Sequence, residues 1–177
     1  MQLDIDVVWN VTYPSEKIIF QVARLLYQEW NDSIERWLDD VYFYLIEKNW
    51  RLTYLEKENR LIGAMIYKHL PRSNSVALSY IILHKDFREK GLGTFLLKRL
   101  ENYATHMGAL SVFFDSSEPL GRVKKYFFID KLGYSIAKIP VLLPDEPPLT
   151  YLFIKFLSAH KCIDSVSYTH LTLPTKA

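Results

Sequence analysis

The sequence lacks most of the features that mark disulfide-linked, metal-thiolate or membrane-spanning proteins. Its 177 residues include one cysteine, Cys162, so no disulfide can form within the chain and a zinc site of several cysteines is excluded. We interpret Cys162 as an inert thiol, because it lies beyond the last regular segment and thiol reactivity depends on environment. No apolar run approaches the roughly 18 to 20 residues of a membrane span, and residues 1–6 do not resemble a signal peptide. We therefore expect a cytoplasmic protein with no metal and no membrane partner.

The sequence also has little excess charge of either sign. The formal net charge is +2, whereas proteins that neutralise nucleic-acid phosphates usually carry a larger basic excess. About half the residues are apolar and a quarter are charged, which is ordinary for a globular protein. We expect one domain over residues 1–158 that has no nucleic-acid partner.

Apolar periodicity predicts an α/β chain in which helices and strands are mixed. Helical spacing predicts helices over 18–30, 34–45, 93–107 and 118–131. Alternation or β-branched runs predict strands over 3–11, 51–57, 61–67, 75–83, 110–114, 134–143 and 149–157. Helices alternate with strands in the centre, and a strand meander lies at each side. This order predicts one mixed sheet with helices packed against it.

The tail over residues 159–177 shows no periodicity, and we expect it to be irregular. Its last stretch, 167–177, resembles adapter-derived read-through at the ends of some assembled sequences, so we exclude it from the fold prediction.

The most informative segment is a turn with the spacing Arg-x-x-Gly-x-Gly, Arg88 to Gly93, between a buried strand and an amphipathic helix. The first backbone N–H groups of a helix have no partner within the helix and carry partial positive charge. Glycines there let the backbone approach an anion closely, which favours phosphate binding. The spacing differs from both the dinucleotide fingerprint and the NTPase phosphate loop. On the pattern alone, glycines that simply begin a helix remain an alternative.

In this context the chain resembles the GNAT superfamily of acyl-CoA-dependent N-acyltransferases. The hydrophobic strand Leu78–Leu83 precedes the Arg88–Gly93 turn, and a later strand and helix end in Leu132-Gly133-Tyr134, as in that family. The resemblance covers about residues 2–157. It implies a single mixed, mainly antiparallel sheet of about seven strands with helices on both faces. It further implies an N-acetyltransferase that moves an acetyl group from acetyl-CoA to a primary amine.

The resemblance also implies where coenzyme A binds. Backbone amides of the turn and first helical residues would hold the pyrophosphate: Arg88, Glu89, Lys90, Gly91, Leu92, Gly93 and Thr94. Backbone groups of Ile81 and Leu83 would pair with the pantetheine arm, and an N–H near Ile82 or Leu83 would stabilise the oxyanion. In the family the strand 75–83 splays from the next one, and the thioester lies in the gap. The side chains of Ile81 and Leu83 also fit plain core positions.

The sequence departs from the family at the residue that protonates the leaving thiolate. Many members place a Tyr four residues before the Gly of the Leu-Gly-aromatic end, and here that position is Ile129. Tyr126 lies one turn earlier and shares a helix side with it. We predict Tyr126 as the general acid. Structural packing of Tyr126, with the thiolate protonated by solvent, is the alternative.

The general base is open among several residues that lie at element ends. The candidates are Glu29, Tyr80, His84, Asp115 and the pair Ser116-Ser117. Each of them also fits a solvated or capping role, and a positioned water could replace them all.

The acceptor is a small-molecule or peptide amine that the sequence does not specify further. A polyamine, an amino sugar, an amino acid, a protein N-terminus and a lysine all fit, and a homodimer is compatible with the sequence. Aromatic residues are interpreted as core and rim, with an acceptor-side role as the alternative: Trp30, Trp37, Tyr42, Phe43 and Tyr44. Asp145-Glu146 could attract a cationic amine or form a solvated turn. An acyl-CoA-binding module without efficient chemistry, suggested by Ile129, and a nucleotide-binding switch are the rival functions.

Overall fold

The computed structural model describes residues 4–116, 125–140 and 149–157. The chain divides into two compact units, Met1–Lys68 with Leu78–Arg99 and His69–Ala77 with Leu100–Ala177. Seven strands pair in the order β1-β2-β3-β4-β5-β7-β6. The expected boundary near residue 158 stays a prediction, because the tail lies outside the described residues.

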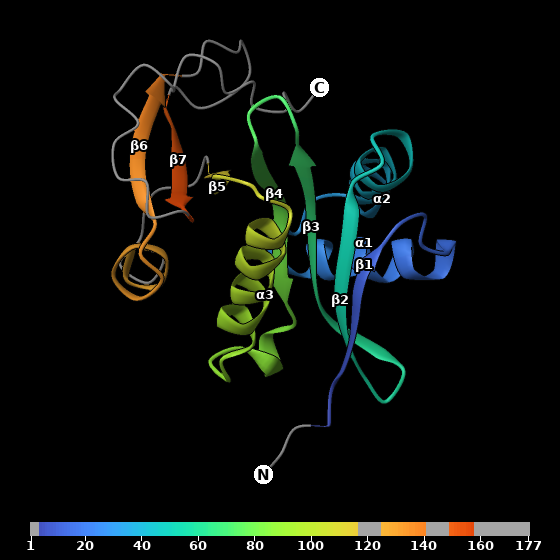
Figure 1. Cartoon of the computed structure of the whole chain (residues 1–177). Coiled ribbons are helices and arrows are strands. Elements are labelled where there is room, and N and C mark those ends of the chain that lie inside the picture. The colour runs from blue at the N-terminus through green and yellow to red at the C-terminus, as the bar shows by residue number, and fades with distance from the viewer. Residues whose placement is uncertain (1–3, 117–124, 141–148, 158–177) are drawn as a thin grey trace. The chain divides into compact units, whose positions relative to one another are not determined.

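The first unit contains a mixed set of strands and helices (Figure 1). Its elements are β1 (Asp6–Val11), α1 (Glu16–Trp30), α2 (Ile34–Tyr42), the π-helix η1 (Phe43–Glu47), β2 (Arg51–Lys57), β3 (Arg60–Leu70), the second part of β4 (Ser75–Leu83), the 3-10 turn η2 (Lys85–Phe87) and the first part of α3 (Leu92–His106). The strand β1 pairs antiparallel with β2, and β2 pairs antiparallel with β3. Glu58 and Asn59 connect β2 to β3 with φ of 51° and 60°. Two residues with positive φ are what a tight hairpin turn needs.

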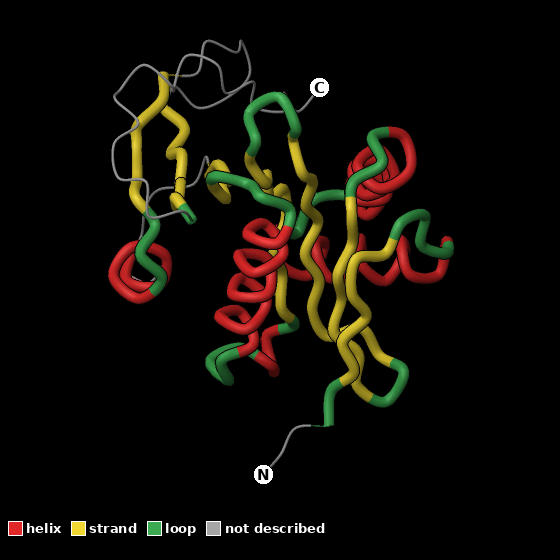
Figure 2. The backbone as a smooth tube through the Cα atoms, in the orientation of Figure 1, coloured by secondary structure: helices red, strands yellow, loops and turns green. Residues whose placement is uncertain are grey.

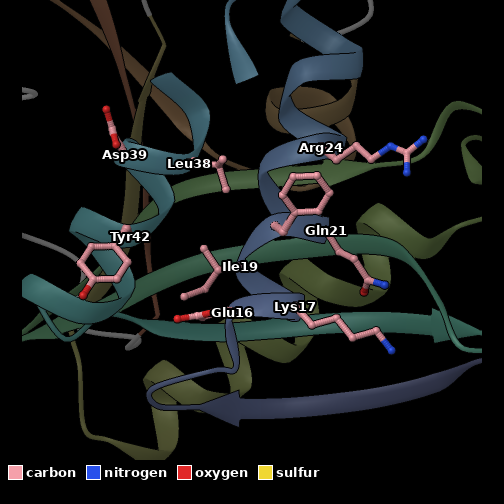
Figure 3. A pocket seen from close by; sticks show the side chains of 9 residues that line it. Glu16, Lys17, Ile19, Gln21, Arg24, Leu38, Asp39 and Tyr42 are labelled. Carbon is pink, nitrogen blue, oxygen red and sulfur yellow. The ribbon is translucent and has the colours of Figure 1, made fainter. Parts of the chain in front are cut away.

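The helices of this unit begin and end where the local sequence provides caps. Ser33 precedes α2, and its Oγ accepts the Arg36 N–H at 3.1 Å. At the end of α1, Asn31 adopts φ 47° and its N–H donates to the Tyr27 carbonyl. The helices α1 and α2 lie on one face of the strands and the first part of α3 lies on the other (Figures 1 and 3). The buried core of this unit contains the aromatic residues Trp37, Tyr44, Trp50, Tyr67 and Tyr80 and many aliphatic ones, among them Val22, Leu26, Leu45, Leu52, Leu55, Ile62, Met65, Ile66, Leu96 and Leu97.

The second unit is built around β5 (Ser111–Ser116), β6 (Ser135–Pro140), β7 (Leu149–Phe156) and the π-helix η3 (Lys125–Lys131). The start of β4 pairs parallel with β5 over Ser75–Ala77, whereas β7 pairs antiparallel with both β5 and β6. Phe114 stacks on Phe153 with ring centroids 4.8 Å apart. This aromatic contact holds β5 and β7 together on one side of the unit.

Most of the expected helices and strands are confirmed (Figure 2). The strands 51–57 and 75–83 match the predicted bounds, and the predicted fold class is correct. The second helix differs, because it turns into the π-helix η1 at Phe43. Of the helix predicted over 118–131, the described part is the π-helix η3, and residues 117–124 and 141–148 lie outside the described part of the chain.

Candidate functional site

The predicted phosphate turn forms the start of α3. The N–H of Phe95 donates to the Gly91 carbonyl at 2.9 Å, so Gly91 caps the helix that begins at Leu92. The N–H groups of Gly91 through Thr94 therefore have no partner within the helix. Gly91 has φ 81°, and a Cβ built there would meet no atom within 4 Å. The positive φ explains why a glycine stands at position 91, and the space next to its Cα is open.

Thr94 adds a side chain to this row of amides. Its Oγ1 is buried and has no hydrogen-bond partner among the described residues. A buried hydroxyl without a partner is uncommon in proteins, because leaving it unpaired costs free energy. Thr94 lies in the first turn of α3, where helix N–H groups favour anions. The hydroxyl is therefore placed to contact the same anion as the amides.

Arg88 and Lys90 bring positive charge to the turn, but both contact the protein itself. The Nε of Arg88 donates to the Leu83 carbonyl at 3.1 Å, and its guanidinium pairs with the Glu29 carboxylate on α1. Lys90 Nζ donates to the Asp86 carbonyl at 2.7 Å. Arg88 therefore ties the turn to both β4 and α1. Exposed pairs of this kind contribute about 0 to 1 kcal/mol, so its effect is chiefly on position.

The end of β4 presents alternate backbone groups to its two edges. The His84 N–H donates to the Ile62 carbonyl of β3 at 2.8 Å. The Ile82 carbonyl oxygen also faces β3, 3.3 Å from a Cβ built at Gly63. Because strand backbone groups alternate between edges, Ile81 and Leu83 face the opposite edge. These two residues, rather than Ile82, can hydrogen-bond an added extended chain there.

Gly63 lies next to the predicted pantetheine strand, and the sequence alone did not point to it. A Cβ at this position on β3 would lie 2.6 Å from Leu83 Cδ2. Gly63 thus keeps space for the Leu83 side chain at the predicted pantetheine strand. The available signal was an isolated glycine inside a strand pattern, which marks close approach of another group.

The candidate bases of the first unit are engaged with other residues. The His84 side chain is 7% exposed, and the Arg60 guanidinium lies 2.8 Å from its Nε2. A guanidinium only donates, and His84 Nδ1 accepts the backbone N–H of Asp86 at 3.3 Å, so both ring nitrogens already have partners. Glu29 pairs with Arg88. The Tyr80 hydroxyl donates to Asp40 Oδ2 at 3.0 Å, and burial followed by the Asp40 charge raises the pKa of Tyr80 far above its ordinary value.

The candidates of the second unit are more exposed. Tyr126 is 63% exposed on η3, which gives little support to the packing alternative for its side chain. Asp115 is an exposed residue of β5 and pairs with Leu152 on β7. Ser116 lies at the end of β5, whereas Ser117, Asp145 and Glu146 lie outside the described residues.

The first unit contains two pockets that differ in whether the predicted cofactor-binding residues line them. One of about 380 Å³ includes the predicted residues Leu83 and Arg88, and its complete lining is Leu25, Gln28, Glu29, Leu83, His84, Lys85 and Arg88. A larger one, about 700 Å³, lies between α1 and α2 (Figure 3) and contains none of the predicted cofactor-binding residues. Of these two pockets, the smaller one therefore borders the predicted residues at the end of β4.

The described part of the chain shows no cluster of three or more His, Cys, Asp or Glu residues suited to a metal ion. None of the helices in the described ranges is long and apolar enough to cross a membrane.

Comparison with known proteins identifies the family. Residues 20–134 match the model of the acetyltransferase (GNAT) family. An aminoglycoside 6'-N-acetyltransferase from Enterococcus faecium has a TM-score of 0.68 at 15% identity, over 89% of this chain and 99% of that chain. An aminoglycoside 6'-N-acetyltransferase in complex with coenzyme A gives the same TM-score, identity and coverage.

The fold is shared by enzymes with different acceptors. The ribosomal-protein-S18-alanine N-acetyltransferase from Escherichia coli has a TM-score of 0.62 at 11% identity, over 87% of this chain and 94% of that chain. Among curated proteins, no relative matches the sequence significantly. At these low identities the solved structures show the fold, and the family match over residues 20–134 adds the class of reaction. This chain belongs to the acetyltransferase (GNAT) family and is an acyltransferase enzyme.

Proposed function

We propose that the enzyme transfers an acetyl group from acetyl-CoA to a primary amine by direct attack of the amine on the thioester. The observation that carries this proposal is the row of N–H groups from Gly91 to Thr94 that have no partner within α3, joined by the buried Thr94 Oγ1, which has no partner among the described residues. This arrangement suits the pyrophosphate of coenzyme A. A neighbour with the same fold contains coenzyme A.

The pantetheine arm would pair with Ile81 and Leu83 as an added strand, because their backbone groups face the edge away from β3. Holding the thioester and the amine together supplies much of the acceleration in a reaction of this kind. Because Ile82 faces β3, the available donors for the developing oxyanion are the N–H groups of Ile81 and Leu83.

Tyr126 would return a proton to the leaving thiolate. Its exposed side chain on η3 is compatible with this role. The absence of a hydroxyl at Ile129 itself favours the second candidate function, an acyl-CoA-binding module with little catalysis.

The acceptor is proposed to be a small-molecule or peptide amine of the cytoplasm. Proteins of this fold include aminoglycoside and ribosomal-protein-alanine acetyltransferases. These two acceptors differ in size and chemistry, so the fold alone selects neither for this chain.

A thermal-shift comparison followed by a thiol-release assay tests the proposal. Acetyl-CoA at 100-fold over its dissociation constant should stabilise the protein by about 2.7 kcal/mol, whereas ATP and GTP should not. Release of coenzyme A thiol with an amine panel then distinguishes an enzyme from a binding module. Stabilisation by ATP or GTP but not by acetyl-CoA would instead favour a nucleotide-binding switch.

The variant Gly91→Val tests the turn itself, with Gly108→Val as its control. Both glycines have positive φ, 81° and 72°, and a Cβ at either one meets no atom within 4 Å. The two substitutions therefore impose similar backbone strain. We expect only Gly91→Val to abolish the acetyl-CoA shift, and equal shifts in the two variants would reject the assigned turn.

A further inference from the structure

Tyr80 of β4 and Asp40 of α2 form a contact that the proposed reaction has not used. The buried Tyr80 donates its hydroxyl proton to Asp40 Oδ2 at 3.0 Å. Asp40 itself is half-buried. Among the residues the structure describes, no Lys, Arg or His forms an ion pair with this carboxylate. The neutral Tyr80 hydroxyl hydrogen-bonds the carboxylate without compensating its charge, so the carboxylate can accept a cation.

Aromatic rings surround this contact. The ring of Trp37 packs edge-on to Tyr80 at 6.0 Å, and the ring of Tyr44 does so at 5.8 Å. Trp30 lies 5.5 Å from Trp37. Aromatic faces attract cations, so the rings and the carboxylate favour the same ligand charge.

Trp37 provides an independent sign that a ligand belongs here. Its side chain is 7% exposed, and its Nε1 has no hydrogen-bond partner within the described ranges. A buried indole N–H usually has a partner. A polar ligand with an oxygen next to its amine would supply one.

The position of Tyr80 along β4 relates this contact to the reacting end of the cosubstrate. In the proposed function the pyrophosphate lies at the Gly91 turn, and the pantetheine arm runs back along Leu83 and then Ile81. The next residue in that direction is Tyr80, about 3.3 Å further along the strand. The thioester end of the arm thus comes beside Tyr80. His84 and Glu29 lie toward the phosphate end and are already paired with Arg60 and Arg88.

We propose that Asp40 receives the ammonium group of the acceptor and removes one of its protons, and that Tyr80 is the positioning residue that orients the carboxylate. This inference rests on the proposed acetyl transfer. The ammonium gives one proton to Asp40, and the neutral amine forms the C–N bond as the C–S bond breaks. The nitrogen loses its second proton, the thiolate takes up one, and Asp40 releases its own to water.

The proposed role of Tyr80 depends on its hydrogen bond to Asp40 Oδ2, which orients the carboxylate. The charged or titratable groups acting on the Tyr80 hydroxyl are Asp40, Tyr44 and Arg36. Loss of this hydrogen bond should therefore lower kcat/KM for protonated acceptors and leave a neutral acceptor unaffected.

The test uses the full chain with acetyl-CoA and four protonated amines, namely spermidine, glucosamine, a lysine peptide and a peptide with N-terminal alanine. Hydroxylamine, which is mostly neutral at neutral pH, serves as a fifth acceptor that needs no base. The variant Asp40→Asn should lower kcat/KM for the protonated acceptors by roughly 100- to 1,000-fold. It should leave the hydroxylamine rate within about threefold, because no ammonium proton has to be removed.

Two further variants separate chemistry from folding. Asp39→Asn changes the neighbouring exposed carboxylate, which lines the pocket between α1 and α2 (Figure 3), and should leave all rates unchanged. Tyr80→Phe should lower kcat/KM for the protonated acceptors less than Asp40→Asn does, and it should leave the hydroxylamine rate unchanged. The acetyl-CoA thermal shift should stay the same in all three variants.

Each other outcome counts against the assignment. Full rates of Asp40→Asn with protonated amines, or equal losses with hydroxylamine and spermidine, would overturn the role of Asp40 and leave acetyl transfer intact. A wild-type protein that binds acetyl-CoA but releases no thiol with any amine would instead overturn the proposed function, and the Asp40 role with it.

Discussion

The two ends of the proposed reaction site in the first unit are built from different parts of the chain. The phosphate end uses backbone N–H groups around Gly91, and the lack of a side chain at Gly91 leaves these groups accessible. The acceptor end uses the side chains of Asp40, Tyr80 and Trp37, which come from two elements. The first end is defined within one short segment, whereas the second requires a tertiary contact. The phosphate end should therefore be sensitive to added bulk, and the acceptor end to the loss of single functional groups.

Among the remaining variants the largest effect is expected for Tyr126, which extends the comparison to the second unit. Tyr126→Phe should lower kcat about 100-fold, the lower end for a general acid, because coenzyme A thiolate leaves readily. Steady-state thiol release measures this change. Tyr13→Phe is a matched control, since Tyr13 is also 63% exposed. Unchanged turnover of Tyr126→Phe would assign the proton transfer to solvent.

At the phosphate end, the Thr94 side chain is predicted to add a hydrogen bond to those of the backbone. Thr94→Val should weaken acetyl-CoA binding about tenfold, because a hydrogen bond to a charged group is worth about 1.5 kcal/mol. The same substitution should stabilise the free protein, since it removes a buried hydroxyl without a partner. Calorimetric titration and a melt without ligand measure the two opposite changes. A loss of stability in the free protein would show that the hydroxyl already has a partner.

Gly63→Ala tests whether the phosphate end depends on space as well as on hydrogen bonds. The new Cβ would lie 2.6 Å from Leu83 Cδ2, so the Leu83 side chain must move. We expect a loss of about 1 kcal/mol in the free energy of unfolding, at the low end for overpacking because a leucine methyl can shift. Denaturant melts measure this loss. Acetyl-CoA binding should weaken too, and wild-type values for both quantities would contradict the close approach.

The smallest effect is expected for Glu89, which has φ 61° in the turn. Glu89→Gly should tighten acetyl-CoA binding about two- to fivefold, because it removes a negative charge near the pyrophosphate and a strained backbone angle. Glu58→Gly relieves a similar φ of 51° in the β2–β3 turn. It should change stability without changing affinity. If Glu89→Gly and Glu58→Gly raised the affinity for acetyl-CoA equally, the gain would be due to the relief of backbone strain and not to the lost charge.

Local features of the sequence were predicted better than contacts between distant residues. The strand 75–83 and the helix start after Gly91 follow from periodicity and glycine spacing, which are properties of neighbouring residues. The pairing of Tyr80 with Asp40 joins residues 40 apart, and that of Arg88 with Glu29 joins residues 59 apart. No local pattern encodes such contacts. For the same reason the sequence analysis missed Asp40 and Gly63, whose roles depend on what another element brings next to them.

The contact of Arg88 with the Leu83 carbonyl has a consequence for the affinity of the cosubstrate. This hydrogen bond, together with the Glu29 pair, fixes the last residue of β4 before any ligand arrives. An incoming arm then meets a preorganised strand end and loses less conformational entropy on binding. The carbonyl oxygen still has a second lone pair to offer. In the proposed binding mode, Arg88 would therefore favour binding because it orders the end of β4 before the cosubstrate arrives.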